Sequence, residues 1–118
     1  MDLEAARDHC LSLPESTEGF PFGPDVLVFK VAGKMFALLS LEAVPPSMNV
    51  KCDPERAIEL RAQYPAVQPG YHMSKKHWNT VVLDGTVPTD LVRGFIDDSW
   101  RLVASKLPKR DRVRLGLA

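Results

Sequence analysis

Two apolar segments, separated by a short turn that contains glycine, place the tightest constraint on how this chain folds. They are VLVFKV at residues 26–31 and MFALLS at residues 35–40, with Ala32-Gly33-Lys34 between them. Glycine readily adopts the backbone conformations that tight hairpin turns require. The pattern therefore predicts two antiparallel strands joined by a hairpin loop.

The rest of the chain carries patterns for two further strands and three helices. We expect the strands at residues 47–52 and 78–83, where apolar and β-branched residues gather between turn signals. Apolar residues three and four positions apart predict helices with capping side chains at Asp2, Asp53 and Thr89. These elements predict one domain of the α+β class, residues 1–118, with a largely antiparallel sheet packed against helices.

Two segments rich in proline are expected to connect these elements. Residues 15–25 (ESTEGFPFGPD) hold Phe20 and Phe22, and we expect these rings to fold back onto the core as an ordered lid. Residues 65–70 (PAVQPG) are expected to be a connector that follows the second helix. Within that helix, the spacing places Ile58 among the buried residues.

Composition bounds the class of protein. Apolar residues make up 45% and charged residues 25% of the 118 residues, as in ordinary globular domains. No run of about 18 apolar residues is present, so no membrane partner is expected. The N-terminal segment lacks the basic start and apolar run of a signal peptide. We therefore expect a cytoplasmic protein in which Cys10 and Cys52, which form no CxxC pair, are reduced thiols.

Charge is unevenly distributed along a chain whose net charge is zero. Residues 1–29 carry six acids and one base, whereas residues 99–118 carry six bases and one acid. A folded molecule with such blocks would be bipolar. The alternative is that the basic residues only complement the dipoles of nearby helix ends. Zero net charge argues against strong non-specific attraction to a polyanion.

The segment 70–81 (GYHMSKKHWNTV) is the part of the chain richest in groups that bind anions, donate protons or stack. His72 and His77 are five residues apart, which matches neither a helical nor an extended metal-binding pair. Ser74 lacks the motif of a nucleophilic serine, and phosphate-binding glycine loops are absent. No catalytic residue, metal or cofactor is therefore predicted, whereas anion recognition by the lysines, histidines and Trp78 remains.

Five stretches of the sequence carry a family resemblance: residues 70–88 (GYHMSKKHWNTVVLDGTVP), 51–57 (KCDPERA), 61–72 (RAQYPAVQPGYH), 98–110 (DSWRLVASKLPKR) and 17–38 (TEGFPFGPDVLVFKVAGKMFAL). Together they cover nearly the whole chain, and they resemble the MmcQ/YjbR-like family of bacterial proteins. The resemblance implies a CyaY-like, two-layer α+β fold with N- and C-terminal helices on the sheet. It also implies DNA binding through hairpin "wings", and no established enzymatic activity.

The residues expected to contact DNA or another anion combine these two lines of reasoning. In the wing arrangement, the turn at Lys34 and the loop around Lys75 would lie near phosphates. The full expected set is Lys30, Lys34, Lys51, His72, Lys75, Lys76, His77, Trp78 and Asn79. The alternative for this segment is structural: Tyr71 and Trp78 would be core aromatics, His72 a buried histidine and the lysines a solvated turn.

Three hypotheses of function remain open. The first is weak, salt-dependent DNA binding through phosphate contacts with little base readout. The second is a site for a small anionic or planar ligand, enclosed between Phe20-Pro21-Phe22 and the cluster of His72, Lys76 and Trp78. The third is a protein-interaction module.

Overall fold

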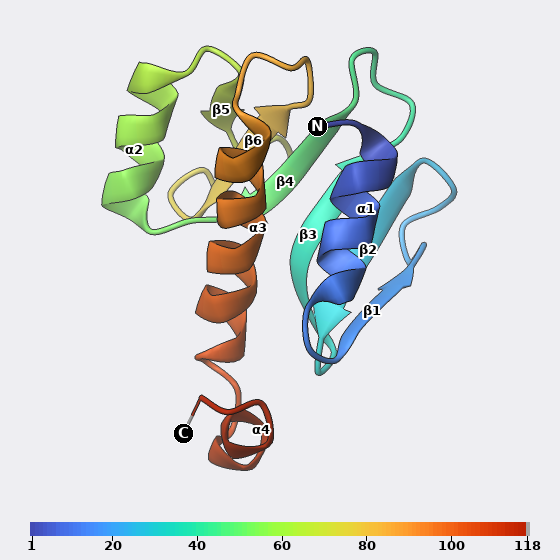
Figure 1. Ribbon diagram of the computed structural model, residues 1–118, viewed down its shortest axis with the longest axis vertical. Coiled ribbons are helices and arrows are strands. Elements are labelled where there is room, and N and C mark those ends of the chain that lie inside the picture. The colour runs from blue at the N-terminus through green and yellow to red at the C-terminus, as the bar shows by residue number, and fades with distance from the viewer. Residues whose placement is uncertain (118) are drawn as a thin grey trace.

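The computed structural model describes residues 1–117 as a six-stranded antiparallel sheet with helices against one face (Figure 1). The strands lie in the order β1-β2-β3-β4-β6-β5. Their bounds are β1 Ser16–Gly19, β2 Val26–Val31, β3 Lys34–Ser40, β4 Ser47–Lys51, β5 Val67–Pro69 and β6 Trp78–Val82. The helices are α1 Leu3–Ser12, α2 Pro54–Gln63, α3 Thr89–Ala104 and α4 Lys109–Arg114. The predicted two-layer α+β arrangement is confirmed.

The helix layer and the sheet enclose one core. Helix α1 packs on β1 and β3, α3 lies across β2, β3 and β4, and α2 covers β5 and β6. Phe29 from β2, Met48 from β4 and Ile96 from α3 are each 0% exposed in this core. Their burial follows from the alternation of the strands and from the apolar stripe of α3.

A β-bulge interrupts the pairing of β2 with β3. Phe29 pairs with Ala37 and Lys30 pairs with Met35, so Phe36 is one extra residue in β3. The ring of Phe36 is fully buried and lies against Phe29, with centroids 6.4 Å apart.

A buried serine of α3 bonds the helix to the sheet beside the β-bulge. The Ser99 hydroxyl donates to the Phe36 carbonyl oxygen at 2.5 Å and accepts from the Lys51 amide at 2.7 Å. It therefore joins α3 to both β3 and β4.

The helix starts confirm two of the three expected caps. The Asp2 carboxylate accepts from the Ala5 amide, and Asp53 accepts from Arg56 with Pro54 directly after it. The expected cap at Thr89 is wrong, because Pro88 is the N-cap of α3 and Thr89 is its first residue.

Two expectations of burial are also wrong. Ile58 is 65% exposed because α2 directs Ala57 and Leu60 towards the sheet. Phe20 and Phe22 are 52% and 65% exposed. Their loop follows edge strand β1, and Phe22 lies beside Leu38 on the sheet face opposite the helices rather than over the core.

No helix among residues 1–117 is long and apolar enough to cross a membrane.

Candidate nucleic-acid interface

Three lysines from different elements line one hollow at the end of the sheet next to α4. Lys34 begins β3, Lys51 ends β4 and Lys106 follows the last turn of α3. The hollow has a volume of about 250 Å³, with Met35 and Leu107 among its apolar lining residues. We call this region, with the cations that adjoin it, the basic end.

The three lysines have no carboxylate partner among the residues that the structure describes. Within residues 1–117, the cations in ion pairs are Arg7, His9, Arg93, Arg101 and Arg114. The ammonium groups that line the hollow are therefore free to bind an anion from solution, and each provides three donors.

Further cations adjoin this hollow. Lys30 is the cross-strand partner of Met35, which lines the hollow, although Lys30 itself lines a separate hollow near β1 that Glu18 also lines. Lys76 and His77 directly precede Trp78, the partner of Lys51, and the His77 carbonyl oxygen accepts from the Cys52 amide at 2.8 Å.

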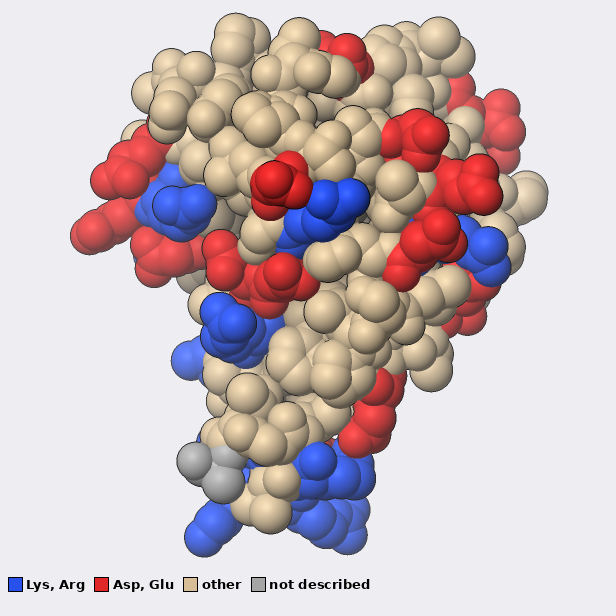
Figure 2. All heavy atoms as spheres, in the orientation of Figure 1, with Lys and Arg blue, Asp and Glu red and all other residues tan. Residues whose placement is uncertain are grey.

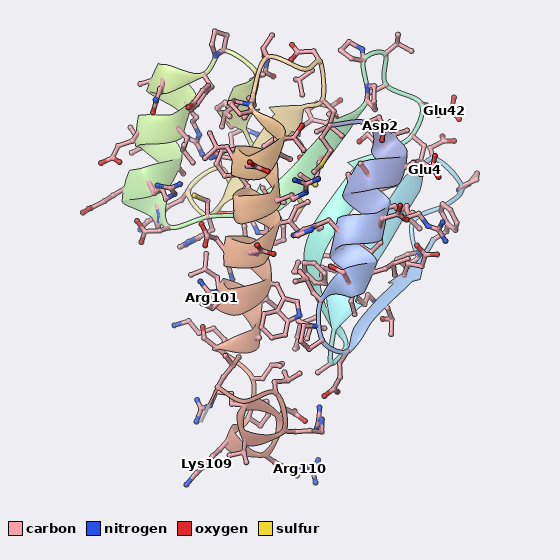
Figure 3. All side chains as sticks on the ribbon, viewed as in Figure 1. Asp2, Glu4, Glu42, Arg101, Lys109 and Arg110 are labelled. Atoms are coloured by element: carbon pink, nitrogen blue, oxygen red, sulfur yellow. The ribbon has the colours of Figure 1, made fainter. Side chains whose placement is uncertain are left out.

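Helix α4 extends the same end of the molecule. Lys109 and Arg110 project from α4, whereas Asp2, Glu4 and Glu42 lie at the opposite end (Figure 3). Figure 2 shows the corresponding cluster of Lys and Arg side chains over α4. Positive charge therefore predominates at the α4 end, whereas acidic and basic side chains are intermixed over the middle of the molecule.

Two of the expected contact residues take part in internal hydrogen bonds. The Lys75 ammonium group donates to the Gly70 carbonyl oxygen at 2.9 Å. Asn79 is 2% exposed, and its side-chain oxygen accepts from the Arg61 guanidinium at 2.7 Å. Arg61 also donates to the carbonyl oxygens of Lys75 and Trp78, so it ties α2 to the loop before β6.

His72 is exposed on the open sheet face and does not line the hollow of the basic end. Its ring packs on Tyr71, with centroids 4.0 Å apart, and its backbone has a φ of +58°. Trp78 is partly buried within β6, and its backbone lies against Gly70. The structural alternative is incorrect for Tyr71, which is 67% exposed, and for His72, which is exposed rather than buried.

The structure thus divides the expected set into three groups. Lys34 and Lys51 line the hollow, and Lys76 with His77 lies next to the end of β4. Lys30 and His72 line hollows on the open sheet face. Lys75, Trp78 and Asn79 help to hold the loop before β6. Sequence reasoning did not include the other cations of the basic end: Lys106, Lys109 and Arg110. The basic stretch that follows Pro108 was the signal for the last two.

Burial raises the pKa of the Cys52 thiol, which is partly buried after β4. Its side chain is therefore a protonated thiol at neutral pH, and is a weak nucleophile.

Two proteins of Escherichia coli are similar to this chain over nearly its whole length. YbdF of strain O157:H7 is 42% identical over 112 residues, which cover 95% of this chain and 92% of YbdF. YjbR of strain K12 is 29% identical over 115 residues, which cover 98% of each chain. Both are described as uncharacterized proteins, so neither supplies an activity.

Two solved structures have the same fold. Protein DR2400 of Deinococcus radiodurans gives a TM-score of 0.92 at 43% identity, covering 99% of this chain and 89% of DR2400. A protein of Pseudomonas syringae gives a TM-score of 0.76 at 28% identity, covering 86% of this chain and 98% of its own. A family model described as YjbR matches residues 11–102, which include the sheet and most of α3. The motifs, the fold and the relatives agree, and the chain belongs to the YjbR family.

Proposed function

We propose that this protein binds DNA through phosphate contacts at its basic end, with little readout of base sequence. The observation that carries the proposal is the convergence of Lys34, Lys51 and Lys106 on one hollow without carboxylate partners within residues 1–117. Cations without carboxylate partners can each donate to a phosphate oxygen of the DNA backbone. Such a contact needs a donor but no geometry specific to a base.

The contact set is narrower than the one expected from sequence. It includes Lys30, Lys34, Lys51, Lys76 and His77, and it adds Lys106 with the cations of α4. Lys75 and Asn79 are left out because their side chains already bond within the protein. Lysine presents a point charge rather than a planar fork, which favours contacts that position the duplex over contacts that read bases.

Fluorescence anisotropy with a short labelled duplex tests the proposal. Binding to phosphates releases counterions, so the affinity should fall steeply between about 50 and 200 mM salt. Lys34→Gln and Lys51→Gln should each weaken binding and lower the salt slope by about one. Arg93→Gln is the matched control, because Arg93 already pairs with Asp90. The proposal is wrong if duplex binding is absent at micromolar protein or independent of salt.

A further inference from the structure

A groove of about 490 Å³ lies on the face of the sheet opposite the helices. Val26, Met35 and Leu38 from β2 and β3 give the groove an apolar lining. Phe22 lines it from the loop before β2, and Tyr71 with His72 line it from the loop before β6. The second sequence hypothesis placed the same two loops together, although Lys76 and Trp78 are not among the residues that line the groove.

The aromatic side chains of this groove are unusually accessible. Phe22 is 65% exposed and Tyr71 is 67% exposed. Rings of this size more often bury most of their surface. Here their faces remain available for a planar group that enters the groove.

A hydrogen-bond network on the sheet holds the backbone of Tyr71 in place. Asn49 of β4 and Thr80 of β6 are cross-strand partners, and the Thr80 hydroxyl donates to the Asn49 side-chain oxygen at 2.5 Å. The Tyr71 amide donates to the Thr80 hydroxyl at 2.9 Å, and the Tyr71 carbonyl oxygen accepts from the Asn49 amide group at 3.1 Å. These bonds hold the backbone of Tyr71 at the edge of the groove before any ligand binds, and part of the ordering cost of binding is thereby already met.

Cations adjoin one end of the groove and suit an anionic guest there. Within the described chain, the groove lining itself holds no Asp, Glu, Lys or Arg. Met35 lines both the groove and the hollow of the basic end, so the two regions adjoin. Lys30, the cross-strand partner of Met35, lies next to that junction. A planar group in the groove would thus have cations nearby for a linked phosphate.

We propose that the open sheet face binds single-stranded DNA, with unpaired bases stacked on Phe22 and on the Tyr71–His72 pair. The adjoining lysines contact the phosphates of the same strand. Stacking on aromatic side chains tolerates any base, because every base has a π-face. The inference rests on the proposed function for its phosphate contacts and extends the ligand from duplex DNA to unpaired bases.

Anisotropy with labelled oligo-dT tests this inference beside the labelled duplex. Phe22→Leu and Tyr71→Leu keep an apolar side chain but remove the ring, so each should weaken oligo-dT binding by roughly tenfold. Both should leave duplex affinity unchanged. The matched control is Phe20→Leu, which alters an exposed ring of the same loop that does not line the groove. A 2-aminopurine base placed within the dT strand should lose emission on binding, because stacking on a protein ring quenches it.

The two proposals fail in different ways. If the duplex binds and Lys34→Gln weakens it, but the ring variants bind oligo-dT as tightly as the unaltered protein, only the single-strand inference is overturned. The same holds if oligo-dT does not bind at all. If neither nucleic acid binds, the proposed function itself is wrong and the inference falls with it.

Discussion

Cys10 lies where α1 meets α3, close to a contact between the two helices. It is fully buried, and the neighbouring His9 side chain bonds Asp97 of α3 at 2.7 Å. Burial, with a smaller contribution from the negative charge of Asp97, raises the pKa of the Cys10 thiol to about 12. The folded protein therefore keeps this proton under conditions in which the unfolded chain loses it.

This difference predicts a loss of stability at alkaline pH. The ordinary pKa of the thiol is 9.0, so between about pH 9 and pH 12 the unfolded state binds fewer protons than the folded state. The free energy of unfolding should then decrease as the pH rises, and the contribution is fully present below pH 9. Urea unfolding at pH 8 and pH 10 measures it. Cys10→Val, which has no thiol, should show the smaller decrease; equal decreases in the two proteins would contradict the prediction.

The role of Asn79 could not be predicted from the sequence around it. Its amide belongs to a chemical type that contacts DNA, and the sequence places it beside two lysines and two histidines. What decides its role is Arg61, which lies on α2 and is distant in the sequence. The local pattern identified the donor groups correctly, but it contains no information about which of them the fold uses internally.

At the scale of elements, a strong periodic pattern of apolar residues was sufficient to predict a strand or helix. Short segments without such a pattern were not predicted. Strands β2, β3, β4 and β6 and helices α1, α2 and α3 were predicted because each carries its own apolar pattern. Strands β1 and β5 contain 4 and 3 residues and lie in segments rich in glycine or proline. Such strands form because a neighbouring strand offers unpaired backbone groups, so their own side chains give little signal. Helix α4 buries no residue, so its sequence carries no apolar stripe and it was not predicted.

The contact of Gly70 with β6 gives a prediction at this scale. A Cβ at position 70 would lie 2.8 Å from the Cβ of Trp78 and 2.9 Å from its carbonyl oxygen. Gly70→Ala should therefore lower the free energy of unfolding by about 1–3 kcal/mol, as overpacking does. For Gly94 in α3, no atom beyond its chain neighbours and the adjoining backbone of its own helix lies within 4 Å of such a Cβ. Gly94→Ala should raise the free energy of unfolding by up to about 1 kcal/mol, since alanine favours helix. Urea unfolding of both variants is the measurement, and changes of the same sign would count against this account.

At the scale of the whole molecule, zero net charge is a poor guide to binding. The molecule measures 39 × 32 × 25 Å along its principal axes. The Debye length at physiological ionic strength is about 8 Å. A ligand at the basic end is therefore screened from most of the acids at the opposite end. The sequence predicted an uneven distribution of charge, and the fold shows where cations predominate, at the α4 end, although Glu15 and Asp111 pair with Arg114 there.

The cations of α4 should set how fast duplex DNA associates. Neutralising both in a Lys109→Gln, Arg110→Gln double variant should lower the association rate several-fold at low salt and less at high salt. Unfolding should be unaffected, because both side chains are exposed. Glu42→Gln at the opposite end changes the net charge without touching the basic end, and should leave the rate at physiological salt unchanged. Stopped-flow fluorescence measures both rates. If only net charge mattered, Glu42→Gln, which adds one positive charge, would speed association, and that result would contradict the prediction.

The bulge in β3 has a consequence for the direction of Lys34. Val31 pairs with Lys34 and faces the core, so Lys34 lies on the helix side of the sheet, beside Lys106. Ala37 also faces the core, although it is an odd number of positions from Lys34. In a regular strand, two residues separated by an odd number face opposite ways. Phe36, the inserted residue, shifts the alternation of side chains along β3 by one position. As a result, Lys34 lies on the same face of the sheet as Lys106.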